Sequence, residues 1–432
     1  MPFGVDTGDK QVSEATRSAR GDLEQRPTLL PPECREPVEE PRQPHPGRGE
    51  VPDVRFLQAV SQTRARRGRG VTSARMSTVA EPAPALGYRP GLDGMRAVAV
   101  LLVAGVHTHP RLVPGGSIGV DAFFVLSGFL ITTLLVEELD TLDCIFFGRF
   151  YARRALRLFP ALLGLLAVVT LWAALVAAPD TRHKALLEVL AALSYTRNFT
   201  FWSHVPGPLL GHTWSLALEE QFYLVWPLLM TALVRPGQSA MRLVRGFVGI
   251  FVVFGTLRMC HFTGPGLVFI MRPEALMLGA AVALVRREHG HRWTGEEGRR
   301  WAAWGVTIGG AGLVVLGAWN GADNFFSAGF SIAALCSAAL ILGLVVLDDS
   351  GPARAFTGRT LVAFGRMSYG FYLWHLPVLR WTDDRLVGRS AMVRVPVGLG
   401  LALAATLVSY RVLERPALRL KRRFLAPTKV AA

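Results

Sequence analysis

Apolar runs separated by short polar connections recur along the chain from Leu92 onward. A helix needs about 20 residues to cross the hydrocarbon core of a bilayer, and each run is close to that length. The ten runs cover residues 92–109, 118–136, 159–178, 214–234, 244–261, 265–285, 301–319, 327–347, 361–381 and 393–413. This pattern predicts an all-α polytopic membrane protein with about ten transmembrane helices.

The charges of the connecting segments predict how these spans are oriented. The segments RFYARRALR, RPGQSAMRLVR, RREHGHRWTGEEGRR and RPALRLKRRF are basic, whereas HPRLVPGGS holds one arginine and WNGADNFFS holds none. The loop 382–392, with Arg385 and Arg389, is an exception to this alternation. Because Lys and Arg are enriched in cytoplasmic loops, both termini are expected in the cytoplasm.

Residues 1–88 differ in composition from the rest of the chain. They are rich in Pro, Arg and Glu and lack apolar periodicity, which is typical of a segment that cannot fold alone. They form either a disordered tail or a stretch that precedes the natural start, for which Met76 is the candidate. A transmembrane domain over 89–416 and a basic cytoplasmic tail over 417–432 are expected to follow.

Composition narrows the possible functions. The chain has 432 residues, of which 51% are hydrophobic, and a formal net charge of +15. Its arginines lie mostly between the apolar runs, so membrane orientation explains the charge better than nucleic-acid binding does. The four cysteines are scattered singly without a C-x-x-C pair, so neither a metal site nor a disulfide framework is supported.

The first span carries two ionisable groups, Arg96 and His107, inside an apolar helix. Eleven residues of α-helix make three turns plus roughly 20°, so the two share one face and lie about 16 Å apart along the axis. Charged groups inside a membrane are costly and therefore indicate function by default. The competing interpretation is that Asp93 caps the helix, Arg96 reaches to the interface and His107 is a hydrogen-bonded packing residue.

Other polar residues recur in the later spans. On the topology above, Asp121 lies level with His107, where a carboxylate could orient the imidazole, although helix capping also explains its position. Ser127 lies deeper and is interpreted as an interhelical hydrogen-bonding residue. The remaining candidates, expected like His107 in the outer half, are Glu219, Glu220, Arg272, Glu274 and His375. A structural ion-pair network could explain some of them.

A basic rim is expected on the cytoplasmic side. It comprises Arg96, Arg149, Arg153, Arg154, Arg157 and Arg366, with an R-x-x-R spacing at 154–157. Membrane anchoring is one explanation of this rim. The other is a cradle for a polyanionic ligand, because arginine binds phosphate in bidentate fashion. Coenzyme A, with phosphates and a long flexible arm, fits a path from this rim to His107, which would act as a general base.

At these residues the sequence resembles the acyltransferase 3 family of integral membrane O-acyltransferases. The resemblance rests, in order, on LDGMRAVAVLLVAGVHTH, PGGSIGVDAFFVLSGFLIT, FYARRALRLFPALL, HTWSLALEEQFYLVWPLL, MRPEALMLGAAVA and MSYGFYLWHLPVL, and covers about residues 88–415. It implies acyl transfer from acyl-CoA to a carbohydrate-type hydroxyl. By the same resemblance His107 is the catalytic histidine, and Arg96, Arg154 and Arg157 are essential.

The prediction is therefore a bacterial plasma-membrane enzyme that moves an acyl group, most simply acetyl, from acyl-CoA to a sugar hydroxyl of an envelope glycan, glycolipid or glycosylated natural product. No metal is expected, and the oligomeric state is not predicted. The expected catalytic residues are His107, Asp121, Glu219 and Glu220, the acyl-CoA contacts are Arg96, Arg153, Arg154 and Arg157, and the further polar residues, for substrate or structure, are Arg272, Glu274, Tyr369 and His375.

Three questions stay open at this point. Transfer can proceed directly or through an acyl-histidine. A transporter or flippase of a lipid-linked sugar is the alternative function, in which the acidic residues would be coupling or substrate sites. A membrane scaffold without chemistry is the third, and it predicts that neutralising His107 changes only stability. The esterase-like domain of some family members is not expected, because the sequence ends at Ala432.

Overall fold

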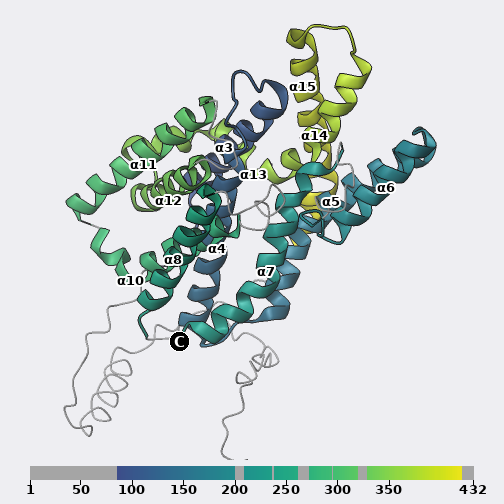
Figure 1. Ribbon diagram of the computed structural model, residues 1–432. Helices are drawn as coiled ribbons and strands as arrows, with labels where there is room; N and C mark the ends of the chain where they lie inside the picture. The colour runs from purple at the N-terminus through teal and green to yellow at the C-terminus, as the bar shows by residue number, and fades with distance from the viewer. Residues whose placement is uncertain are drawn as a thin grey trace, which may run out of the picture. The chain divides into compact units, whose positions relative to one another are not determined.

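The computed structural model describes residues 85–199, 209–235, 238–260, 272–293, 295–319 and 328–420 (Figure 1). Within these ranges all regular elements are helices. Most of the predicted N-terminal tail, the Met76 start and most of the C-terminal tail lie outside the described residues. The helical elements that matter below are α3 (Pro90–Thr108), α4 (Ile118–Leu142), α5 (Phe147–Leu175), α6 (Pro179–Leu193), η1 (Gly211–Thr213), α7 (Trp214–Leu233), α8 (Met241–Met259), α10 (Pro273–His289), α11 (Glu296–Ala318), α12 (Gly329–Leu347), η3 (Gly351–Phe356), α13 (Arg359–Arg366), α14 (Ser368–Arg385), α15 (Ala391–Ser409), η4 (Tyr410–Glu414) and α16 (Arg415–Leu420).

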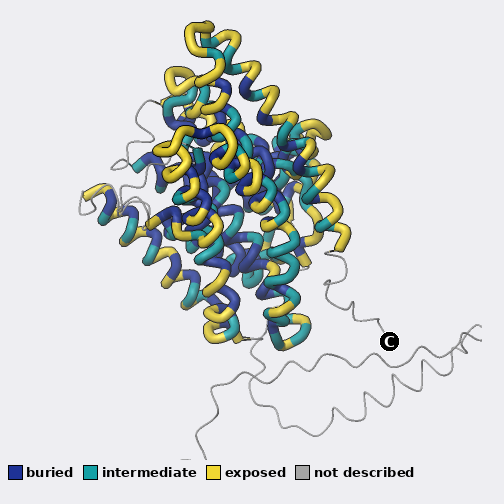
Figure 2. Tube along the Cα trace, turned by 90° about the vertical axis from the view of Figure 1, so that its right-hand side faces the viewer, coloured by how far each residue is buried: buried dark blue, intermediate teal, exposed yellow. Residues whose placement is uncertain are grey.

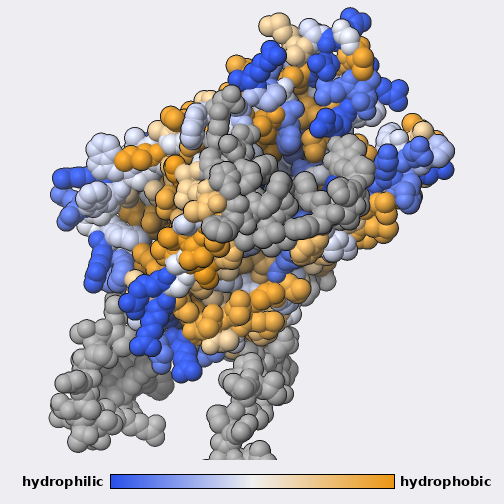
Figure 3. All heavy atoms as spheres, viewed as in Figure 1, coloured by the Kyte–Doolittle hydropathy of each residue, from blue (hydrophilic) through white to orange (hydrophobic). Residues whose placement is uncertain are grey.

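Six helical segments of the described chain are long and apolar enough to cross a membrane. They are α3, α4, α5, α11, α12 and the continuous segment Ala391–Leu420. The chain is thus an all-helical membrane protein, while the count of ten spans and the cytoplasmic termini stay predictions. Large exposed side chains such as Leu171 and Leu224 fit lipid-facing surfaces. In Figure 3 hydrophobic residues gather in the middle of the visible face, and hydrophilic ones gather toward helix ends.

The helices differ from the hydropathy pattern in three places. α5 begins at Phe147, about three turns before the predicted span, so the arginine-rich segment is part of the helix rather than a loop. The predicted span 361–381 is two helices, because α13 ends at Arg366 and α14 begins at Ser368. α6 follows α5 where no helix was predicted, since its sequence is too polar for a hydropathy criterion.

α4 lies at the centre of the helix assembly. Its apolar window is 78% buried, against 33% for α5 and 17% for Ala391–Leu420, and dark blue marks the buried interior in Figure 2. α4 packs on α3, α7, α10 and α12. At its crossing with α10 a Cβ on Gly128 would lie 2.0 Å from the Leu276 carbonyl, and one on Gly279 would lie 2.0 Å from the Val125 carbonyl. Glycine at both positions therefore allows the close backbone contact, as expected for membrane helices.

Both predicted site residues of α3, Arg96 and His107, contact the C-terminal helix α14. α3 packs on α13, α14 and η3 as well as on α4. Arg96 Nε donates a hydrogen bond of 3.1 Å to the Ser368 hydroxyl at the start of α14. The ring of His107, near the end of α3, lies beside the ring of His375 further along α14. α3 and α14 therefore run in the same direction, side by side.

Candidate active site

Three histidine rings meet where α3, α14 and η1 come together. The ring centres of His107 and His375 are 5.4 Å apart, and those of His212 and His375 are 5.2 Å apart. His375 is fully buried and His212 nearly so, whereas His107 is exposed. His107 is thus the accessible imidazole of the three, and it lies beside the buried ring of His375.

The hydrogen bonds of the buried rings define their protonation. His375 Nδ1 is 2.6 Å from the Tyr372 carbonyl oxygen, and His212 Nε2 is 3.2 Å from that of Leu373. A carbonyl oxygen only accepts, so these two nitrogens carry the protons. The other nitrogens, Nε2 of His375 and Nδ1 of His212, are buried and have no hydrogen-bond partner among the residues that the structure describes.

Aromatic rings connect this histidine cluster (His107, His212 and His375) to Arg96. The guanidinium of Arg96 lies 5.9 Å from the ring centre of Phe123, whose ring lies 6.4 Å from that of Tyr372. The Tyr372 ring is in turn 5.5 Å from His375. A row of aromatic contacts therefore runs from the Arg96 end of α3 to the histidine cluster.

A cluster of arginines surrounds the Arg96 end. Arg154 Nη2 binds Glu220 Oε1 at 3.0 Å, and its guanidinium lies 3.2 Å from the ring centre of Tyr223. Arg154 Nε is buried without a partner in the described chain. Arg157, one turn further along α5, lies within electrostatic range of Arg96, Arg154 and Glu219 and makes neither a hydrogen bond nor an ion pair with any described residue. Arg96, Arg154 and Arg157 thus retain unsatisfied donors or charge for an anion.

Arg153 differs from these three arginines. Its Nη2 forms an ion pair of 3.4 Å with Glu138 of α4. Arg153 and Arg154 are adjacent on α5 and therefore point about 100° apart. Arg153 thus pairs with α4, whereas Arg154 pairs with α7 beside Arg157, and this makes Arg153 a weaker candidate for an acyl-CoA contact.

The two carboxylates of α7 lie with the arginines. Glu219 Oε1 accepts hydrogen bonds from the hydroxyls of Ser127 and Tyr223, and Glu220 binds Arg154. Grouping Glu219 and Glu220 with His107 at one depth, apart from Arg154, is therefore wrong. Hydropathy cannot show how far α5 and α7 are shifted along each other, and this offset decides which side chains meet. The interpretation of Ser127 as an interhelical hydrogen-bonding residue is confirmed.

The expected contact between Asp121 and His107 does not form. Both carboxylate oxygens of Asp121 accept hydrogen bonds from Arg272, and no bond joins Asp121 to His107 in the described chain. Arg258 of α8 pairs with Glu274 beside this bond. These side chains are almost completely buried, and Arg272 also lies 4.0 Å from the Phe330 ring centre. Asp121, Arg272 and Glu274 thus belong to a buried ion-pair network, the competing interpretation of the sequence.

The sequence interpretation missed two candidate residues, and it gave Tyr369 no specific contact. The Tyr369 hydroxyl donates to the Leu158 carbonyl of α5 at 3.0 Å.

His212 is one of the two missed residues. It begins the motif HTWSLALEE, and its position just before a helix was the available signal. Glu414 ends the π-helical turn η4, is buried, and lies within electrostatic range of Arg157. A π turn has no reliable sequence signal, although such turns are frequent at functional sites.

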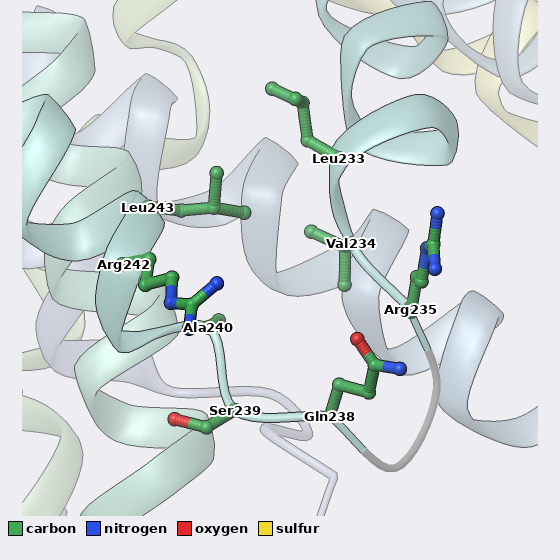
Figure 4. A pocket seen from close by; sticks show the side chains of 8 residues that line it. All are labelled: Leu233, Val234, Arg235, Gln238, Ser239, Ala240, Arg242 and Leu243. Carbon is green, nitrogen blue, oxygen red and sulfur yellow. The ribbon is translucent and has the colours of Figure 1, made fainter.

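In the described chain, neither a metal cluster nor the cavity between α7 and α8 involves the predicted site residues. No group of three or more His, Cys, Asp and Glu side chains that could hold a metal ion occurs among the described residues. A separate cavity lies at the connection between α7 and α8, where Arg235 and Arg242 stand on opposite sides of Gln238 (Figure 4). Its lining contains none of the predicted site residues. It is lined by Leu233, Val234, Arg235, Gln238, Ser239, Ala240, Arg242 and Leu243.

Comparison with known proteins gives one family and a set of bacterial relatives. Residues 89–411 match the family model described as an acyltransferase domain. The proteins named O-acetyltransferase OatA of Staphylococcus aureus strains NCTC 8325 and COL are each 30% identical to this chain over 348 residues. These alignments cover 76% of this chain and 57% of each relative, so the chain spans little more than half of their length. No solved structure matches the chain significantly.

Proposed function

The chain belongs to the acyltransferase 3 family, and from this premise we propose that it transfers an acetyl group from acetyl-CoA to a hydroxyl of a sugar-containing acceptor. The observation that carries the proposal is the arrangement along α3. Arg96 and His107 share one face of this helix, an arginine cluster surrounds the first and the histidine cluster the second. The name of the Staphylococcus aureus relatives supports acetyl as the group transferred.

The phosphates of the donor would bind at Arg96, Arg154 and Arg157. Three guanidinium groups close together repel one another, and the ion pair with Glu220 compensates only Arg154 directly. Arg157 has carboxylates within electrostatic range but makes no hydrogen bond or ion pair with one in the described chain, and the Nε of Arg154 is without an acceptor there. Phosphate oxygens would satisfy both, since charge-assisted hydrogen bonds to arginine are short and strong.

The pantetheine arm would extend from the arginines toward the histidine cluster. Phe123 and Tyr372 line this direction and offer apolar ring faces to a chain that carries little charge. At about 1.5 Å per residue, the eleven residues between Arg96 and His107 separate the two ends by about 16 Å. A long flexible donor can span this separation, whereas a small acyl phosphate cannot.

His107 would act as the general base, because it is the accessible imidazole of the cluster. One ring nitrogen takes the proton of the acceptor hydroxyl as the hydroxyl oxygen bonds to the thioester carbonyl carbon. The carbon–sulfur bond then breaks, and the same proton passes from His107 to the departing sulfur. The products are the acyl ester and free CoA, so the proton and the electron pairs balance without a further reactant.

A sugar hydroxyl in a bacterial envelope glycan, glycolipid or glycosylated natural product is the proposed acceptor. It follows the family's substrate class, and the exposure of His107 at the end of α3 is compatible with a bulky acceptor. The plasma membrane is the proposed location, because the six candidate spans need a bilayer and the relatives are bacterial.

The test is turnover of acetyl-CoA by the full chain in nanodiscs with a panel of glycan acceptors. His107→Ala should lose transfer by roughly 100-fold or more, the range typical of a lost general base. His109→Ala is the matched control, because His109 is exposed two residues further along and its side chain makes no hydrogen bond, ion pair or ring contact within the described chain. Equal losses in both variants would contradict the assignment of the base. Wild-type protein that binds acetyl-CoA without ever transferring acetyl, while moving a lipid-linked sugar, would support the transporter alternative.

A further inference from the structure

We propose that His375, rather than a carboxylate, is the residue that positions His107 by accepting a hydrogen bond from it. This inference rests on the proposed function, in which His107 is the base. An imidazole that works as a base needs one nitrogen free and the other held by a partner, because the held nitrogen fixes the tautomer. The question is which neighbour of His107 can be that partner.

His375 has the chemical state that the role requires. Its Nδ1 donates to the Tyr372 carbonyl at 2.6 Å, which leaves Nε2 as an unprotonated acceptor. This nitrogen is buried and has no partner in the described chain. A buried polar atom without a partner costs free energy, so it calls for a donor.

His107 is placed to supply that donor. The two ring centres are 5.4 Å apart with an angle of 41° between the ring planes. A ring nitrogen lies roughly 1.1 Å from its ring centre, so facing nitrogens at this separation would be about 3.2 Å apart, within hydrogen-bond range. Because His375 is the fixed member of the pair, the hydrogen bond requires that a nitrogen of the exposed His107 ring turn toward Nε2 of His375.

The surroundings of His375 hold its ring in place. The Phe371 ring lies nearly parallel to it at 6.2 Å, and the ring of His212 stands edge-on at 5.2 Å. The hydroxyl of Tyr372 donates to the His212 carbonyl at 2.9 Å and lies 2.6 Å from the Ser215 hydroxyl. α14, η1 and the start of α7 are thus tied together around the buried acceptor.

The carboxylate that the sequence suggested for this role is engaged elsewhere. Asp121 is bonded through both oxygens to Arg272. Releasing it would leave Arg272 buried and uncompensated, which is expensive. A neutral acceptor such as His375 Nε2 fixes the tautomer of His107 and stabilises its protonated form without placing a net charge beside the acyl group.

During transfer the proton stays on His107. The acceptor hydroxyl gives its proton to the free nitrogen of His107, and the opposite N–H of His107 points to Nε2 of His375. The proton then moves from the same His107 nitrogen to the sulfur of CoA. His375 gains and loses no proton, so it is a positioning residue rather than a catalytic one.

Two substitutions separate positioning from packing. His375→Phe keeps a ring of similar shape but removes the acceptor, and His375→Gln keeps an acceptor oxygen near the position of Nε2. We expect His375→Phe to lower kcat roughly 10- to 100-fold with little change in the KM for acetyl-CoA, because a lost partner changes the tautomer and not the donor site. His375→Gln should recover most of this loss. Equal damage in both variants, or a change confined to KM, would overturn the proposal.

A second measurement does not depend on activity. The ring-nitrogen chemical shifts of ¹⁵N-histidine-labelled protein in nanodiscs report the tautomer of each imidazole, and the His107 signals are assigned by their loss in His107→Ala. The wild type and His375→Gln should show one dominant His107 tautomer, and His375→Phe a mixture. An unchanged tautomer in His375→Phe would refute the inference even if acyl transfer is confirmed. A changed tautomer in a protein that transfers no acyl group would uphold the contact while the proposed function fails.

Discussion

The carboxylate of Asp121 in α4 and the guanidinium of Arg272, just before α10, form a two-pronged ion pair in the interior of the protein. Nε and Nη2 of Arg272 both donate to it, and both side chains are almost completely buried. The pair joins the central helix α4 to the helix that makes its closest backbone contact. Its position indicates a structural role, which can be tested by measuring stability separately from acyl transfer.

Replacing Asp121 alone should destabilise the protein. Asp121→Asn leaves the charge of Arg272 buried without compensation, which costs about 3–5 kcal/mol. The double variant Asp121→Asn/Arg272→Gln removes both charges and should unfold at a higher temperature than the single variant. Thermal unfolding in detergent measures the difference. A single variant that is as stable as wild type but inactive would instead give Asp121 a direct part in the reaction.

Replacing Arg157 should weaken donor binding. Arg157→Gln removes a guanidinium that makes no hydrogen bond or ion pair in the described chain, so we expect the loss to fall on the ligand rather than on folding. A hydrogen bond to a charged group is worth about 1.5–3 kcal/mol, which corresponds to a rise of roughly 10- to 100-fold in the KM for acetyl-CoA. The kcat at saturating donor should change little.

An exposed arginine of another helix serves as the control for this experiment. Arg300→Gln on α11 removes the same charge from the whole protein. Its KM should stay near the wild-type value. If Arg157→Gln and Arg300→Gln raised KM equally, total charge and not the arginine cluster would control binding.

Filling the contact between α4 and α10 should destabilise the helix assembly. Gly128→Val places methyl groups where the Leu276 carbonyl lies, and overpacking of this kind costs about 1–3 kcal/mol. Gly249→Val on α8 is the matched control, because nothing lies within 4 Å of a Cβ at that position. The melting temperature should fall for the first variant only. A stable Gly128→Val protein would show that the two helices can separate without cost.

The pH dependence of stability should depend on Glu188, near the end of the amphipathic helix α6. One of its oxygens accepts hydrogen bonds from the backbone N–H groups of Leu209, at 3.2 Å, and Leu210, at 2.6 Å. Burial raises the pKa of Glu188 above that of the unfolded chain, so the folded state binds its proton more tightly. Proton binding by Glu188 therefore favours the folded state. This stabilisation is fully present below the pKa that Glu188 has in the unfolded chain, and it is lost as the pH rises through the pKa that Glu188 has in the folded protein.

Glu188→Gln removes this titration while keeping an acceptor oxygen. Lowering the pH from 7 to 5 should therefore stabilise the wild type relative to Glu188→Gln. The melting temperatures of the two proteins, compared at each pH, report the difference directly. A difference that is constant across this range would mean that Glu188 does not titrate in the folded protein.

Local properties of the helices were predictable from sequence. Hydropathy identified the apolar helices, and the 3.6-residue period placed Arg96 and His107 on one face of α3, because both depend on spacing along a single helix. The arginines of α5 were also found, although their helix begins earlier than the apolar run suggests.

The partners of the polar side chains were decided by tertiary structure. Asp121 was predicted to face His107 and instead meets Arg272, and Glu220 was grouped with the histidines but meets Arg154. Such pairings depend on crossing angles and on the shift of one helix along another, which the apolar pattern does not encode. The sequence alone thus determined an all-helical membrane protein with a cation and an imidazole on one helix face. Only tertiary packing placed His375 of α14 beside His107 of α3, and His212 of η1 beside His375, because these contacts join residues more than 100 positions apart.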